Sequence, residues 1–338
     1  MNTIRNTQSD YTGKIISLAF PDTFVRFSDE SVLNLLPLFG LGKNRFIKAG
    51  HAAFVLIENS TGNAEYYDFG RYITPEGHGR VRSAVTDVEL EIPFKALMSN
   101  DGALDNIEEF LLWLEDNPQK THGSGRLVAS VCDQVFYDEA RAFVVAMQEK
   151  GSIPYKAFGK EGSNCSRIVT DTILAGTDQK KIIKPLLRNK LFTPSTVGNV
   201  EKAATNNPIY EVKKGIVKVY EGSAFKENMT NYFDKNVPTI QSDTDKGIPE
   251  YLKNAHYLSG TGSSAYFMLE QSQEESLFEI SRYTEIGEED FRGLFEIGSQ
   301  EFDSSKDYQF IYDSNCKYCH IEQDGRKIRF DLVKRIIN

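Results

Sequence analysis

The hydrophobic pattern of the chain changes at about residue 237, and this change limits the folds open to it. Before that point, short apolar runs alternate with amphipathic stretches of helical period: Lys14–Phe20, Asn106–Glu115, Leu127–Val131 and Asp138–Lys150. A polar, acidic stretch follows from Val237 to Pro249, and beyond it come short alternating segments separated by Gly, Asp and Ser. We therefore expect an α+β fold, with one domain over residues 1–240 and a small β-rich domain over residues 245–338.

Composition and charge exclude several classes of protein. The formal net charge of −9 disfavours non-specific binding to nucleic acid, which needs a basic surface. No apolar run is long enough to span a membrane, and the first ten residues show no secretory signal. Four cysteines in a long chain of this kind indicate reduced thiols. We expect a cytoplasmic protein, and export that is independent of a signal peptide stays open.

The segment Gly162-Ser163-Asn164-Cys165-Ser166 carries the strongest chemical signal. Ser and Asn are favoured N-cap residues, so Cys165 is expected in the first turn of a helix that runs to about Ala175. The partial positive charge at a helix N-terminus favours a thiolate, and the free backbone amides there can stabilise an oxyanion. Such a cysteine becomes a nucleophile when a histidine lies beside it.

His51 is the best of the five histidines for this role. It follows Gly50 and begins an apolar run, Ala52–Ile57, which is followed by turn-forming residues and by a second strand-like run, Glu65–Phe69. In a hairpin with an even loop, Asp68 shares a face with His51 and can orient the imidazole; an odd loop would place Tyr67 there instead. The blander alternative is a buried structural cysteine and a structural histidine.

These residues resemble the circularly permuted papain-like cysteine hydrolases. That group includes the peptidases and amidases of the NlpC type and the lecithin–retinol acyltransferase-like enzymes. The resemblance covers about residues 45–180 and rests on Gly50-His51 opening a strand, a polar residue on the next strand, and a later Asn-Cys-Ser opening a helix. It implies that Cys165 is the nucleophile, His51 the general base and Asp68 the orienting group.

Two arginines follow the expected hairpin. Arg80 and Arg82 lie in Gly77–Asp87, which we interpret as a polar loop, and they are candidates for binding the carboxylate of a peptide or peptidoglycan-like substrate. The alternative is a solvated loop in which they pair with Asp87. Arg71 is open to both interpretations.

The run Cys316-Lys317-Tyr318-Cys319-His320 matches the attachment pattern of c-type haem. It lies in a β-rich stretch, and a structural zinc ion would need four ligands where this run offers three. We expect a reduced cysteine pair there, and neither a metal nor a cofactor.

The sequence thus favours a cysteine peptidase or amidase that forms an acyl-enzyme on Cys165. Acyl transfer and thioester hydrolysis use the same residues, and a non-catalytic binding or scaffold protein on the same fold is the alternative of another class. The expected partner is a peptide or another small molecule with an amide or ester bond. Residues 245–338 are a candidate site for a protein partner.

Overall fold

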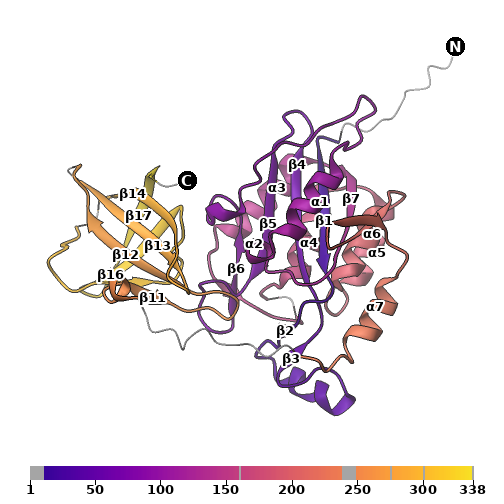
Figure 1. The fold of residues 1–338 in the computed structure, drawn as a ribbon, viewed down its shortest axis with the longest axis horizontal. Helices are drawn as coiled ribbons and strands as arrows, with labels where there is room; N and C mark the ends of the chain where they lie inside the picture. The colour runs from indigo at the N-terminus through magenta and orange to yellow at the C-terminus, as the bar shows by residue number, and fades with distance from the viewer. Residues whose placement is uncertain (1–10, 160, 238–248, 275, 300, 337–338) are drawn as a thin grey trace.

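The computed structural model describes residues 11–159, 161–237, 249–274, 276–299 and 301–336. The predicted boundary between residues 240 and 245 lies outside these residues, so the limits of the two domains stay a prediction. Figure 1 shows a larger part made of helices around a sheet, and beside it a smaller part made of strands. The expectation of mixed helices and strands followed by a β-rich unit is confirmed at this level.

An antiparallel sheet of eight strands forms the centre of the larger part. Its order is β10 (Ile216–Val219), β9 (Ile209–Lys213), β7 (Leu127–Val135), β1 (Gly13–Phe20), β4 (His51–Glu58), β5 (Ala64–Gly70), β6 (His78–Arg82) and β8 (Ile153–Pro154). The predicted hairpin is the pair β4–β5, in which Ala53 lies opposite Asp68. The first strand, β1, lies at the centre between β4 and β7.

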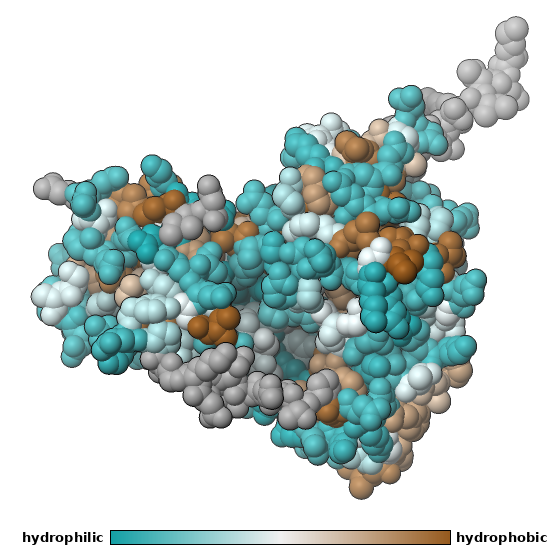
Figure 2. All heavy atoms as spheres, viewed as in Figure 1, coloured by the Kyte–Doolittle hydropathy of each residue, from teal (hydrophilic) through white to brown (hydrophobic). Residues whose placement is uncertain are grey.

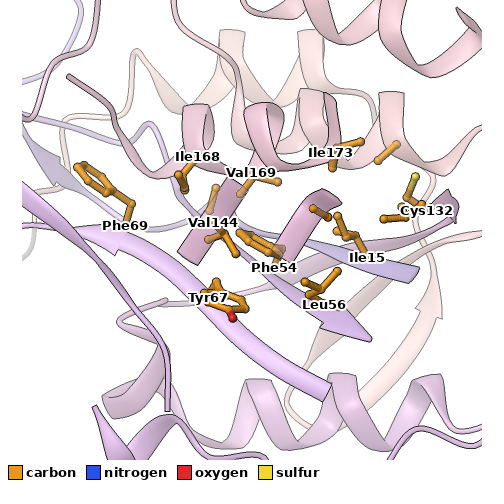
Figure 3. Close-up of a cluster of buried hydrophobic side chains, with 14 of the residues drawn as sticks. Ile15, Phe54, Leu56, Tyr67, Phe69, Cys132, Val144, Ile168, Val169 and Ile173 are labelled. Carbon is orange, nitrogen blue, oxygen red and sulfur yellow. The ribbon is translucent and has the colours of Figure 1, made fainter. Parts of the chain in front are cut away.

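Helices cover both faces of this sheet because its central strands are apolar on both sides. One face of β4, with Phe54 and Leu56, packs under α3 (Tyr137–Gln148), α4 (Cys165–Gly176), α5 (Lys180–Asn189) and α6 (Thr196–Ala204). Figure 3 shows Ile168, Val169 and Ile173 of α4 above this face. The other face, with Val55, packs against α1 (Ile107–Asp116).

Shorter elements surround the ends of these strands. They are η1 (Ser31–Phe39), β2 (Val25–Arg26), β3 (Phe46–Ile47), η2 (Val88–Leu90), α2 (Pro118–Thr121) and α7 (Ala224–Asn231). The short helix η4 (Glu250–Leu252) lies instead in the smaller part, where the Tyr251 hydroxyl donates to Gly287 O at 2.7 Å. The stretch expected to be helical over Ser28–Phe39 is the 3-10 helix η1, with Pro37 inside it. Pro37 lacks the amide that a longer α-helix would need.

The smaller part is an antiparallel sheet of seven strands. Its order is β11 (His256–Leu258), β12 (Ala265–Gln271), β13 (Leu277–Thr284), β14 (Glu289–Ile297), β17 (Arg326–Arg335), β16 (Tyr318–Gln323) and β15 (Gln309–Ile311). The two edge strands approach each other, with the ring of His256 on β11 5.4 Å from that of Phe310 on β15, so the sheet is barrel-like. The predicted turn Asp324-Gly325 joins β16 to β17, and both residues have positive φ.

Buried ion pairs and backbone hydrogen bonds join the two parts. Arg282 on β13 is 2% exposed, and it donates to Asp87 at 3.1 Å and to Glu89 at 2.8 Å. The amide of Ile73 donates to Ser263 O at 2.9 Å, and the amide of Gly262 donates to Arg71 O at 2.8 Å. The smaller sheet is therefore fixed to the segment that follows β5.

One structural expectation is wrong. Gly77–Asp87 was expected to be a polar loop, but His78–Arg82 is strand β6, and Arg80 and Arg82 are both buried. The strand tolerates two buried guanidiniums because each is paired with a buried carboxylate: Arg80 with Asp87, and Arg82 with Asp68.

Candidate active site

Cys165 is the first residue of α4, as its sequence context predicted. The side chain of Asn164 caps this helix, since its Oδ1 accepts from the amide of Arg167 at 2.9 Å. Its Nδ2 donates to Lys156 O at 2.9 Å, which fixes the cap to the preceding loop. The amides of Cys165 and Ser166 belong to the first turn, where a helix supplies no acceptor for them.

His51 begins β4 and lies against Cys165. Gly50 has a φ of 78°, and a Cβ at that position would lie 2.8 Å from Thr196 Oγ1 and 3.0 Å from Phe20 O. A glycine is therefore needed to bring the chain into β4 at this point. The imidazole is buried, and its Nε2 has no hydrogen-bond partner among the described residues. Its interaction with Cys165 raises the pKa of His51 and lowers the pKa of the thiol.

Asp68 lies on the other side of the imidazole. It is fully buried, and its Oδ2 lies 3.7 Å from His51 Nε2, which is an ion-pair contact longer than a hydrogen bond. Arg82 Nε donates to Asp68 Oδ1 at 3.0 Å, and the Tyr66 hydroxyl donates to Oδ2 at 3.2 Å. The carboxylate is thus held in place by neighbours other than the histidine.

These contacts polarise the three groups. Burial alone would lower the pKa of His51, but Asp68 and Cys165 outweigh it and raise that pKa to about 9. Burial alone would raise the pKa of the Cys165 thiol, but the hydrogen bond and charge of His51 lower it. For Asp68, the charge of Arg82 and the contact with His51 overcome burial and hold its pKa well below the usual range. The two shifts act in the same direction, toward an imidazolium at His51 and a thiolate at Cys165.

The other three cysteines have the opposite character. Burial raises the pKa of Cys132 to about 12, and it also raises the pKa values of Cys316 and Cys319. The ring of His320 is turned toward Asp313 O, 3.0 Å from its Nδ1. Within the described residues, no group of three or more His, Cys, Asp or Glu side chains is arranged to hold a metal ion.

Tyr155 completes the site, and sequence reasoning missed it. Its hydroxyl contributes to the lowered pKa of the Cys165 thiol, and its ring stacks on Phe69 with centroids 5.8 Å apart. The guanidinium of Arg71 lies 4.6 Å from the centre of the same ring. Tyr155 follows the two-residue strand β8, which is too short to give a periodic pattern in the sequence.

Two cavities meet at the cysteine–histidine pair, and Arg26 and Tyr155 line both. The first, of about 220 Å³, reaches Cys165 and is mainly apolar. Its apolar lining includes Leu33, Leu36, Leu41, Ile47, Phe158 and Pro194. The second, of about 480 Å³, reaches His51 and is bordered by residues 260–262 of the smaller sheet. We name them the thiol-side cavity and the histidine-side cavity.

The predicted substrate-binding arginines are not in these cavities. Arg80 donates to both carboxylate oxygens of Asp87, at 2.6 and 2.7 Å, and Arg82 is bound to Asp68. Arg80 thus pairs with Asp87, but in a buried strand and not in a solvated loop. Both side chains are buried and bound to carboxylates of the chain, outside the two cavities. Arg71, left open by the sequence, lines the histidine-side cavity instead.

Two parts of the chain match families of known proteins. Residues 15–182 match the family described as type VI secretion system effector TseH-like. The match begins within β1, includes His51, Asp68, Tyr155 and Cys165, and ends within α5. Residues 255–333 match a second family, described as the DUF6695 C-terminal domain. No curated protein matches the chain.

A solved structure adds a distant likeness to the TseH-like match. It is the crystal structure of the type VI secretion system effector TseH, 21% identical in sequence, with a TM-score of 0.43. The comparison covers 63% of this chain and all of the TseH chain. Among the described residues, no helix is both long enough and apolar enough to cross a membrane.

Proposed function

We propose that this chain is a cysteine hydrolase on a permuted papain-like fold, with Cys165 as nucleophile, His51 as general base and acid, and Asp68 as the group that orients His51. Residues 1–240 would be its catalytic domain and residues 245–338 its accessory domain. The observation that carries the proposal is the buried contact between the His51 imidazole and the thiol of Cys165 in the first turn of α4. This contact lowers the pKa of Cys165, while the pKa values of the other three cysteines are raised.

The reaction follows from these positions. The Cys165 sulfur attacks the carbonyl carbon of an amide or ester, and the oxyanion that forms is received by the amides of the first turn of α4. The bond to the leaving group breaks as the His51 imidazolium gives it a proton. Water, deprotonated by His51, then attacks the thioester, which releases the acid and restores the thiol.

The thiol-side cavity suits the acyl part of the substrate, because it reaches the sulfur that becomes acylated. Its lining favours an apolar acyl group. One wall comes from η1, which presents Leu33 and Leu36 inward and leaves Leu38 and Phe39 largely exposed. Apolar spheres gather at the lower end of the molecule in Figure 2, where η1 lies in Figure 1.

The TseH-like match supports a biological setting for this chemistry. The family description names type VI secretion system effectors, and a hydrolase is compatible with that role. We extend the proposal accordingly to a hydrolytic effector, whose substrate is an amide or ester in the target of secretion.

The first experiment is the pH dependence of iodoacetamide labelling at each cysteine, read by peptide mass mapping. Wild type should label fast at Cys165 already near pH 6, because His51 stabilises the thiolate, while the buried Cys132 serves as an internal reference. His51→Ala should shift the midpoint of labelling at Cys165 toward that of a free thiol, about 8.5. His78→Ala, which removes a histidine outside the site, is the matched control.

Two outcomes separate the alternatives. Slow labelling of Cys165 at a rate that is the same in wild type and His51→Ala would overturn the proposal of a hydrolase. It would favour a scaffold protein on the same fold. Fast labelling with a His51 dependence supports an activated thiol. A screen of amides, esters and thioesters, with and without an added amine acceptor, then distinguishes hydrolysis from acyl transfer.

A further inference from the structure

The histidine-side cavity has a charge opposite to that of the protein as a whole. Although the chain carries a net charge of −9, the described residues that line this cavity include Arg26 and Arg71 and contain neither Asp nor Glu. His122, which also lines it, is stacked on Tyr72; burial and the charge of Arg82 lower its pKa to about 3, so it is neutral. The cavity therefore offers two fixed positive charges from arginines.

Arg71 is held in position by its own contacts. Its Nη2 donates to Arg26 O at 2.7 Å, its Nη1 donates to Phe27 O at 3.2 Å, and its guanidinium lies over the Tyr155 ring. These bonds use two of the five donors of a guanidinium, which leaves others for a ligand. A fixed planar guanidinium is well suited to a carboxylate.

The smaller sheet supplies the outer wall of this cavity. Gly260, Thr261 and Gly262, in the connection from β11 to β12, line it together with His51. A Cβ at Gly260 would lie 2.5 Å from the amide nitrogen of Ile73 and 2.8 Å from Arg71 O. Glycine thus allows this connection to pack directly on the backbone that carries Arg71.

The position of the leaving group links this cavity to the reaction. His51 must reach the departing nitrogen to protonate it, so the leaving group lies on the side that His51 lines. We infer that the histidine-side cavity binds a leaving amine that carries a carboxylate, an amino acid or a peptide end, through Arg26 and Arg71, with Gly260–Gly262 as the wall that limits its size. This inference rests on the proposed function of Cys165 and His51.

The chemical step is balanced without a further reactant. The carbon–nitrogen bond breaks as the bond from Sγ to the carbonyl carbon becomes a thioester, and the proton of His51 moves to the nitrogen. The product is a free amine whose carboxylate stays paired with the arginines until it leaves the cavity.

The test compares two alkylating probes on the full-length protein. Iodoacetate and iodoacetamide react with the same thiolate and lose the same iodide, but one carries a carboxylate and the other a neutral amide. The readout is the ratio of the two labelling rates at Cys165, so each variant's iodoacetamide rate serves as its own reference. Arg26→Gln should lower this ratio about threefold, as expected for an exposed ion pair.

A second variant tests the wall contributed by the smaller sheet. Thr261→Asp places a negative charge in the cavity and should lower the ratio about fivefold, while its surface position leaves folding intact. Arg45→Gln and Asn254→Asp make the same changes of charge at exposed positions outside both cavities and are the matched controls.

Failure of this inference is distinct from failure of the proposed function. Suppose that iodoacetamide labels Cys165 fast, and that the ratio of the iodoacetate to the iodoacetamide rate is the same in Arg26→Gln, Thr261→Asp and wild type. This result would overturn the carboxylate site but would not contradict the proposed hydrolase. If the ratio fell equally in the controls Arg45→Gln and Asn254→Asp, the effect would come from the overall charge of the protein. That result would also overturn the carboxylate site. Slow iodoacetamide labelling of Cys165 in wild type would overturn the proposed function itself.

Discussion

At the scale of single residues, the sulfur of Cys165 is surrounded by donors. The His51 imidazole, the Tyr155 hydroxyl and the backbone amide of Ala52 all contribute to the lowered pKa of this thiol. They come from separate segments of the chain, so no single stretch of sequence encodes the environment of the nucleophile. Each contact can be removed separately.

Tyr155→Phe removes one of these donors and keeps the ring. Hydrogen bonds to a charged group contribute about 1.5–3 kcal/mol, so the midpoint of Cys165 labelling should rise by roughly one to two pH units. The measurement is the pH profile of iodoacetamide labelling. Tyr137→Phe, which removes a hydroxyl bound to Glu65 away from the site, should leave the profile unchanged. An unshifted profile in Tyr155→Phe would remove Tyr155 from the site.

Asp68→Asn has two expected effects. Loss of the carboxylate lowers the pKa of His51, so Cys165 labelling should lose its activation near pH 6. It also leaves the buried Arg82 guanidinium without its partner, a change that typically costs about 3–5 kcal/mol of stability. The sequence alone suggests that this variant keeps its fold intact, whereas the buried ion pair predicts a lower urea midpoint.

The control for this variant is Asp178→Asn, which neutralises an exposed carboxylate outside the site. Its labelling profile and its urea midpoint should both match wild type. An Asp68→Asn protein as stable as wild type would show that Arg82 finds another acceptor. An unchanged labelling profile would move the orienting role away from Asp68.

At the scale of elements, the start of α4 and the start of β4 determine the site. Asn164 fixes the first turn of the helix, and Gly50 allows the chain to enter the strand next to it. Both features depend on a few neighbouring residues, so both can be predicted from local sequence patterns. The distance between the first turn of α4 and the first residue of β4 depends on how the helix packs on the strand.

Asn164→Ala tests the cap. Loss of an N-cap side chain costs about 1 kcal/mol, so the urea midpoint should fall modestly. The first turn should also loosen, which would slow labelling of Cys165. Ser223→Ala removes the equivalent cap from α7, where Ser223 accepts from Lys226, and it should lower stability without changing Cys165 labelling. Equal labelling in the two variants would show that the cap does not support the thiol.

The elements that could be predicted are those with a clear period. The strands Lys14–Phe20 and Ala52–Ile57, the helix after Asn164 and most strands beyond residue 260 show regular alternation or helical spacing. The shared face of His51 and Asp68 followed from the same alternation. The helices and strands between residues 180 and 231 went unpredicted, since charged side chains cover much of their surface.

Other features depend on contacts between distant segments. Arginine is seldom buried, so the sequence places Arg80 and Arg82 in an exposed loop. Their buried partners, Asp68 and Asp87, are identified only from the three-dimensional structure. Tyr155 and Arg71 lie in connecting segments that show no hydrophobic periodicity, so the sequence does not predict their position near Cys165 and His51. The contact of Gly260–Gly262 with the segment after β5 joins residues almost two hundred positions apart, which no local pattern encodes.

At the scale of the whole molecule, buried charges hold the two sheets together. Asp87 accepts from Arg80 within the larger part and from Arg282 of the smaller sheet. Burial alone would raise the pKa of Asp87, but these arginines hold it well below the usual range. The junction of the two parts is therefore sensitive to acid.

The sign of this sensitivity follows from the pKa values. Asp68 and Asp87 titrate near 3.8 when unfolded and lower when folded, so their contribution to stability is complete above pH 3.8. It decreases as the pH falls below that value toward the folded pKa. Urea midpoints measured between pH 7 and pH 3 should therefore fall steeply below about pH 4.

Asp303→Asn provides the reference for this measurement. It neutralises an exposed carboxylate far from the junction, and its midpoints should fall with pH as steeply as those of wild type. A midpoint that stays constant from pH 5 to pH 3 would contradict a role for the buried aspartates in stability.

The central place of β1 has a consequence for how the protein is made. Among the strands of its sheet, β1 is synthesised first, but it lies between β4 and β7. One of its edges therefore stays unpaired until Val135 has been synthesised. Closing such long loops of chain makes folding slow, and the apolar strand is exposed in the meantime. The nascent chain therefore needs protection from aggregation before the sheet closes. Cys165 acquires its histidine neighbour later still, so an interrupted polypeptide carries no activated thiol.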